Sequence, residues 1–358
     1  MNLSNELTQL LGIEHPVIQA PMGGDSTPEM AVAVSNAGGL GGLGCSYMAL
    51  QEIEAKVEKI RSLTNAPFNL NFFAHPEPSI DEVVNAKTRA RLASFYAELG
   101  LAGNSGEGIA PCDTFTDERL KLVLELRPKI VSFHFGLPPA EKIRALKDVD
   151  IIIMCSATTV AEAIWLDKSG VDVIIAQGWE AGGHRGTFDV TYEDFGVGTM
   201  ALVPQIVDAV NKPVIASGGI ADGRGIAASL MLGAKGVQLG TAFLSCPEAN
   251  ITSENRSAII NARDDETRLT RAFSGRPARA KTNSYIESIA HDRSRLPDFP
   301  LMYNFSGPLE KACTDGLGDG FEFFLYGQAA SLNRELLAAD LVELLVKETI
   351  ETLSKHLV

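Results

Sequence analysis

The residues best suited to chemistry lie in one glycine-rich loop near the middle of the chain. Gln177 begins the loop, His184 and Arg185 stand inside it, and the apolar run 171–176 precedes it. Such a run is typical of a buried strand, and glycines allow backbone N–H groups to approach a ligand closely. Because a histidine titrates near neutral pH, His184 is the candidate general base or anion-stabilising group of a reaction site.

Two further loops have the composition of a phosphate site. Gly218 and Gly219 follow the apolar run 214–217, and residues 238–241 (Gln-Leu-Gly-Thr) close the run that begins at 236. Backbone N–H groups and helix N-termini bind anions, and the loops after the last two strands of a (β/α)8 barrel often hold a phosphate. Each loop alone is equally typical of an ordinary turn. The two together predict phosphate binding.

A third glycine motif does not predict a nucleotide site. Residues 39–44 match G-x-G-x-x-G, but they follow a predicted helix and occupy the place of a strand. A dinucleotide fingerprint needs a strand before it and an acidic residue about 20 positions later. Positions 63–65 hold no acid. Close packing of a helix on a strand explains these glycines better.

The elements that must position these loops are short apolar runs alternating with segments of helical periodicity. The predicted strands are residues 17–20, 40–43, 68–72, 130–133, 151–154, 173–176, 214–217 and 236–239. Alternation of this kind predicts a parallel sheet, and eight units favour closure into a (β/α)8 TIM barrel. All three candidate loops would then lie at the same end of the barrel.

Two stretches interrupt the repeat. Residues 74–117 lengthen the third connection, and a polar, arginine-rich segment follows the eighth strand. We therefore expect a barrel over residues 1–245, an appended lid-like substrate-binding segment over 246–326, and a C-terminal helix over 327–358 that packs back on the barrel.

Composition narrows the classes of partner. The net charge of −14 argues against nucleic acid and anionic membranes, which need a basic face. The chain has no secretory leader and no run of about 18 apolar residues, so a cytoplasmic location is expected. The five cysteines form no Cys-x-x-Cys pair, and no pair of histidines has metal-ligand spacing, so neither a disulfide framework nor a metal is expected. His15, His75, His134, His291 and His356 lie outside the glycine loops and are assigned no role in the site.

Taken in order, five motifs resemble those of the nitronate monooxygenases. They are Gln19-Ala20-Pro21-Met22-Gly23-Gly24, Asn69-Leu70-Asn71-Phe72, residues 177–186, Ser217-Gly218-Gly219-Ile220 and Gln238-Leu239-Gly240-Thr241. The resemblance spans the predicted barrel and implies noncovalently bound FMN with one histidine, His184, beside it. The residues that it places in contact with FMN are Met22, Asn71, Gln177, Gly182, Gly218, Gly219, Gln238, Leu239, Gly240 and Thr241.

The resemblance also implies a substrate. A family member oxidises a nitronate with O2, and the expected substrate is propionate 3-nitronate. Its carboxylate needs a phenol or a cation, and Tyr303 and Lys311 are the candidates, with Arg185 behind them. Where the family has a tyrosine, this chain has Phe299, so the substrate contacts depart from the family pattern. A monomer or a homodimer fits the sequence equally well.

Two alternatives remain at this point. An FMN-dependent enoyl-[acyl carrier protein] reductase has a similar barrel and histidine loop but uses NADPH. A flavin-carrying binding protein without catalysis belongs to another class.

Overall fold

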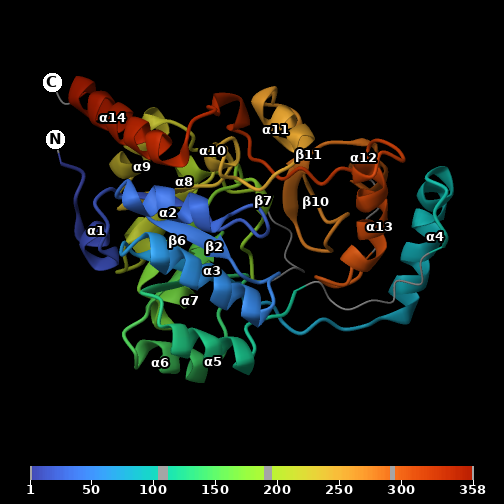
Figure 1. Ribbon diagram of the computed structural model, residues 1–358, viewed down its shortest axis with the longest axis horizontal. Coiled ribbons are helices and arrows are strands. Elements are labelled where there is room, and N and C mark those ends of the chain that lie inside the picture. The colour runs from blue at the N-terminus through green and yellow to red at the C-terminus, as the bar shows by residue number, and fades with distance from the viewer. Residues whose placement is uncertain (1, 104–111, 189–195, 291–294, 357–358) are drawn as a thin grey trace.

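The central part of the molecule is a closed barrel of eight parallel strands. The computed structural model describes residues 2–103, 112–188, 196–290 and 295–356 (Figure 1). The strands are hydrogen-bonded in the order β1-β9-β8-β6-β5-β4-β3-β2, and a parallel bridge between Ile18 and Leu40 joins the two edges. The predicted (β/α)8 barrel is confirmed, and each predicted strand overlaps one observed strand.

The barrel strands are β1 (Val17–Gln19), β2 (Gly41–Gly44), β3 (Phe68–Phe73), β4 (Ile130–His134), β5 (Ile152–Ala157), β6 (Val173–Gln177), β8 (Val214–Ser217) and β9 (Gly236–Leu239). The helices around them are α2 (Pro28–Asn36), α3 (Leu50–Leu63), α5 (Asp117–Leu126), α6 (Ala140–Lys147), α7 (Val160–Lys168), α8 (Thr199–Ala209) and α9 (Gly223–Met231). Helix α1 (Glu6–Leu11) precedes β1, and the short helix α10 (Thr241–Leu244) follows β9.

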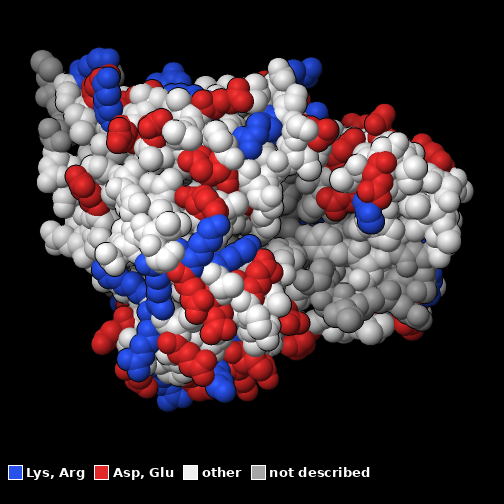
Figure 2. Space-filling model, in the orientation of Figure 1, with Lys and Arg blue, Asp and Glu red and all other residues white. Residues whose placement is uncertain are grey.

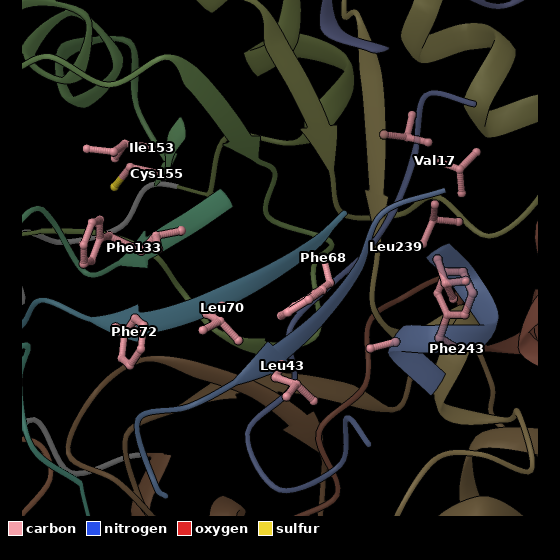
Figure 3. Close-up of a cluster of buried hydrophobic side chains, with 14 of the residues drawn as sticks. Val17, Leu43, Phe68, Leu70, Phe72, Phe133, Ile153, Cys155, Leu239 and Phe243 are labelled. Atoms are coloured by element: carbon pink, nitrogen blue, oxygen red, sulfur yellow. The ribbon is translucent and has the colours of Figure 1, made fainter. Parts of the chain in front are cut away.

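The main hydrophobic core lies between the sheet and the surrounding helices. Leu43, Leu70 and Phe133 leave successive strands on this side of the sheet (Figure 3). A second cluster fills the interior of the barrel at the N-terminal ends of the strands, where Leu7 and Leu11 of α1 contact interior side chains. Since α1 covers that end with apolar side chains, the polar site is left to the opposite end.

A separate hydrophobic core lies beside the barrel. Its side chains come mainly from α4 (Glu82–Glu98), β11 (Ala278–Lys281), α12 (Ser284–Ala290) and α13 (Tyr303–Thr314). Together with β10 (Thr267–Thr270), which pairs with β11, we call these elements the cap subdomain. Both stretches that interrupt the repeat contribute, because Tyr96 of α4 donates a hydrogen bond to the carbonyl of Phe305 at 2.7 Å. Figure 1 shows α4 at the edge of the molecule, packed on α13.

The cap subdomain joins the barrel through a small antiparallel sheet. Its strand order is β10-β11-β7, and β7 (Gly183–His184) belongs to the glycine loop that follows β6. The pairs are Gly183 with Arg279 and His184 with Ala278. The candidate histidine therefore stands on a barrel loop whose backbone pairs with a strand of the cap subdomain.

The C-terminal helix begins later than the sequence predicts. Helix α14 (Ala338–His356) packs on α9 and α2, and Leu341 and Leu345 are buried in that contact. In the preceding segment, residues Ala330–Leu332 form one short 3-10 helix. Asn333, which follows it, donates a hydrogen bond from Nδ2 to the carbonyl oxygen of Thr241 at 2.7 Å. Among the described helices, none combines the length and the apolar character that crossing a membrane requires.

Candidate functional site

One large cavity opens at the C-terminal ends of the barrel strands. Its volume is about 1030 Å³, and it lies between the barrel loops and the cap subdomain. The ten residues that the resemblance assigns to FMN all line it: Met22, Asn71, Gln177, Gly182, Gly218, Gly219, Gln238, Leu239, Gly240 and Thr241. His184 and Tyr303 line it as well. The fold therefore brings residues separated by nearly the whole chain to one cavity.

The backbone of His184 is fixed by two side chains. Its carbonyl oxygen accepts hydrogen bonds from Gln177 Nε2 at 3.0 Å and from His134 Nε2 at 3.1 Å. Gln177 also accepts from the backbone N–H of Gly186 through Oε1 at 2.7 Å. The amide of Gln177 thus holds the loop closed, and one Nε2 hydrogen remains for a ligand.

The imidazole of His184 is held by Ser274 of the cap subdomain. Nε2 lies 2.9 Å from Ser274 Oγ, which also faces the carbonyl oxygen of Arg276 at 3.1 Å. A hydroxyl has one hydrogen, so Ser274 either donates to Arg276 and accepts from Nε2–H, or donates to Nε2. The tautomer of His184 is therefore coupled to the orientation of one hydroxyl.

Aromatic rings surround His184 and keep it neutral. Phe299 and Phe135 approach its ring edge to face, with centroids 5.6 and 5.8 Å away. Burial, with smaller effects from His134 and Arg276, lowers the pKa of His184 to about 3. The guanidinium of Arg276 lies 4.0 Å from the centroid of the Phe135 ring. At neutral pH the group at the site is thus an uncharged imidazole with a buried cation nearby.

His134 belongs to the site, contrary to the sequence-based assignment. His134 ends β4 and lines the cavity. Its Nδ1 atom lies 2.9 Å from Ser156 Oγ, within hydrogen-bond distance. Because a carbonyl only accepts, the bond to His184 places the hydrogen of His134 on Nε2, so Nδ1 accepts from Ser156. Burial lowers the pKa of His134 to about 4. The available signal was its position directly after an apolar run, at the C-terminal end of a barrel strand.

The other histidines lie elsewhere or beyond what the structure describes. His75 is buried against Phe299, with ring centroids 5.0 Å apart, and His15 lies before β1 at the opposite end of the barrel. His291 lies outside the described residues, as does the side chain of His356.

The glycines of the predicted phosphate loops stand where larger residues would be strained or would clash. Gly218 and Gly219 have φ of 107° and 71°, which L side chains rarely adopt. A Cβ on Gly182 would lie 2.5 Å from the backbone nitrogen of Gly327. Thr241 Oγ1 accepts from that same nitrogen at 2.9 Å. Backbone from three loops therefore converges closely enough to surround an anion without a cationic side chain.

Polar groups suited to a ring with mixed donors and acceptors line the deeper part of the cavity. Gln238 Oε1 is buried and has no hydrogen-bond partner in the described parts of the chain. Asn71 Nδ2 donates to Ser132 Oγ at 2.9 Å. A buried polar atom without a partner is costly, so Gln238 indicates a ligand that donates to it.

The predicted substrate residues separate into two groups. Tyr303 reaches the cavity, and its hydroxyl lies 3.3 Å from that of Tyr47. Lys311 does not: its side chain is 74% exposed and pairs with Asp315 at 2.7 Å. Arg185 is fully buried behind the loop and donates to the carbonyl oxygen of Gln177 at 3.0 Å. Neither cation is placed to meet a carboxylate in the cavity.

Comparison with known proteins agrees with this geometry. Residues 4–348 match the family model for nitronate monooxygenase. The chain is 41% identical to a nitronate monooxygenase of Pseudomonas aeruginosa over 97% of this chain and 99% of the relative, and 42% identical to one of Paraburkholderia phytofirmans over 96% and 94%.

Solved structures give the same result. A nitroalkane oxidase from Streptomyces ansochromogenes superposes with a TM-score of 0.90 at 36% identity, covering 98% of this chain and 99% of that one. FabK from Thermotoga maritima is less similar, with a TM-score of 0.76 at 29% identity over 98% of both chains. From its sequence, its barrel and the residues gathered at its mouth, the chain belongs to the nitronate monooxygenase family of oxidoreductases.

Proposed function

We propose that the protein is an FMN-dependent nitronate monooxygenase that oxidises alkyl nitronates with O2 to a carbonyl product and nitrite. The observation that carries the proposal is the position of His184: a neutral, desolvated imidazole fixed at a cavity whose other walls match a flavin nucleotide. Propionate 3-nitronate, which the family resemblance implies, is one substrate to test beside neutral alkyl nitronates.

The residues of the cavity fit FMN. Gly218, Gly219, Gly240 and Thr241 would hold the phosphate through backbone N–H groups, and the unpaired Gln238 Oε1 would accept from the ring. When bound, FMN supplies one-electron transfer between an electron-rich carbon and dioxygen.

The chain itself would bind and orient the nitronate. His184 offers an N–H or a lone pair at a fixed point, and Ser274 sets which of the two faces the substrate. The buried Arg276 helps to keep the imidazole of His184 neutral, because its positive charge lowers the pKa of that group. Phe135, Phe299 and Phe323 exclude water from the imidazole, which strengthens its hydrogen bond to the anion.

The overall reaction balances without a nicotinamide. Two nitronates and one O2 contain the atoms of two carbonyl products and two nitrites. The nitronate is the reductant and O2 the oxidant, so no external reductant is required.

The test is oxygen consumption and nitrite release by protein reconstituted with FMN. We expect both with alkyl nitronates, and we expect His184→Ala to lower kcat/KM by roughly 100-fold while FMN absorbance is retained. His15→Ala changes the same residue type at the far end of the barrel and should leave kcat/KM unchanged. Equal turnover by His184→Ala and wild type would refute the role of His184.

The two alternatives give different results in the same preparation. A flavin enoyl reductase would bleach rapidly with NADPH under anaerobic conditions and turn over an enoyl thioester. A flavin-carrying binding protein would show no nitrite release above that of free FMN. Either outcome would replace the proposal.

A further inference from the structure

The charge of the cavity lining is one-sided. Among the described residues that line it, none is a lysine or an arginine. The lining carboxylates are Asp25, Glu180, Glu254, Glu310, Asp319 and Glu322. Figure 2 shows acidic side chains gathered over the part of the cap subdomain that holds α12 and α13, beside the hollow between this subdomain and the barrel.

Of these carboxylates, Glu310 is the one that shares a helix face with Tyr303, the residue proposed to contact the substrate. On α13, residues Tyr303, Gly307, Glu310 and Thr314 are spaced to share one helix face, and all four line the cavity. Glu310 is half-buried, and its carboxylate has no ion pair or hydrogen bond with any described residue. By contrast, Glu180 accepts from the hydroxyl and the backbone N–H of Thr199.

The charge of Glu310 reaches the tyrosine pair at the substrate end. It contributes to the upward shift in the pKa of both Tyr47 and Tyr303, although burial is the larger cause. Ring contacts connect this tyrosine pair to the histidine, since Tyr303 contacts Phe323 and Phe323 contacts His184. The cavity thus has a neutral imidazole at one part of its lining and an ionisable carboxylate beside the tyrosine pair.

We infer that Glu310 determines which nitronates the site prefers, an inference that rests on the proposed function. The site selects nitronates by the charge at the end far from the nitronate group. It prefers a cationic ammonium tail to a neutral alkyl tail and disfavours a carboxylate tail. With the nitronate group at His184, the tail extends toward Tyr47, Tyr303 and Glu310, which line the same cavity. A carboxylate there meets an unpaired like charge, whereas an ammonium gains an ion pair and contact with aromatic faces.

The experiment compares three preformed nitronates of similar length with the FMN-loaded protein. They are propionate 3-nitronate, butyl 1-nitronate and 3-ammoniopropyl 1-nitronate. Assays run at pH 8.5, because burial raises the pKa of Glu310 to about 7 and the carboxylate is ionised above it. We expect kcat/KM to rise about tenfold from carboxylate to neutral tail and about tenfold again to the ammonium, as for a charge a few ångströms away in a partly desolvated site.

Glu310→Gln keeps the shape of the side chain and removes its charge. We expect the three kcat/KM values to come within about threefold of one another in this variant. Asp315→Asn is the matched control, because it removes a charge from the end of the same helix but does not line the cavity, and it should keep the wild-type order.

Flavin difference spectra under anaerobic conditions give the binding order of the three compounds independently of oxygen uptake. Spectral binding in the predicted order without turnover would refute the proposed function but support the charge selectivity. Turnover or binding that favours propionate 3-nitronate, unchanged in Glu310→Gln, would overturn the inference while leaving the proposed function in place.

Discussion

The buried histidine pair makes a quantitative prediction about stability and pH. Burial lowers the pKa of His134 from 6.5 to about 4. Between these values the unfolded chain takes up a proton on this residue and the folded protein does not. Stability from the neutral histidine is therefore complete above pH 6.5 and is lost as the pH falls toward 4.

His134→Gln removes this titration and keeps an N–H donor for the carbonyl of His184. From the two pKa values, the wild type loses about 2 kcal/mol of unfolding free energy between pH 8 and pH 5 that the variant does not lose. At pH 8 the variant should be less stable by about 1 kcal/mol, because the hydrogen bond with Ser156 is gone. At pH 5 the variant should be at least as stable as the wild type.

The quantity to measure is the difference in unfolding free energy between His134→Gln and the wild type. The pH dependence of the wild type alone would not reveal the contribution of His134. Burial raises the pKa of Asp25 to about 6 and that of Glu310 to about 7. Such carboxyls bind protons more tightly in the folded state, so they contribute a slope of the opposite sign in the same pH range.

The assay is urea unfolding of flavin-free protein at pH 8, 6.5 and 5, followed by tryptophan fluorescence and circular dichroism. Ser156→Ala serves as control, because it removes the hydrogen bond but leaves His134 free to titrate. A stability difference between His134→Gln and wild type that stays constant across this range would refute the assignment of a neutral, desolvated His134.

Three further predictions concern the cavity walls. Gly182→Ala should weaken FMN binding at least tenfold by fluorescence titration, since its Cβ meets the backbone of Gly327, while Gly103→Ala, with open space around it, should not. Gln177→Leu should lower kcat about tenfold with FMN bound, because the loop carrying His184 loses two hydrogen bonds; unchanged kcat would contradict this. Ser274→Ala should change the pH profile of kcat/KM more than FMN affinity, and an unshifted profile would remove its role in setting the His184 tautomer.

The barrel and its glycine loops could be predicted from the sequence because both depend on local patterns. Parallel strands buried on both faces appear as continuous apolar runs, and the glycines after β8 and β9 follow directly from strand position. His184 was found for the same reason, since it stands among glycines after β6.

The features that were missed depend on contacts between distant residues or on helix rotation. In the sequence, His134 has the pattern of an ordinary strand end, and only the structure shows its bond to His184, 50 residues later. Ser274 acts on the site only because β11 pairs with β7. Lys311 and Glu310 are neighbours in sequence, but one residue of α13 turns a side chain by about 100°, so the acid faces the cavity and the lysine faces solvent.

The two-residue strand β7 has a consequence for how activity arises during folding. The barrel and the cap subdomain each have their own hydrophobic core, and His184 is held by both: barrel side chains bind its carbonyl oxygen, while β11 pairs with its backbone and Ser274 contacts its imidazole. Without the cap subdomain, the glycine loops after β8 and β9 keep their places on the barrel, but the imidazole of His184 loses its contact with Ser274. Under the proposed function, we therefore expect activity to require docking of the two parts and not only a folded barrel.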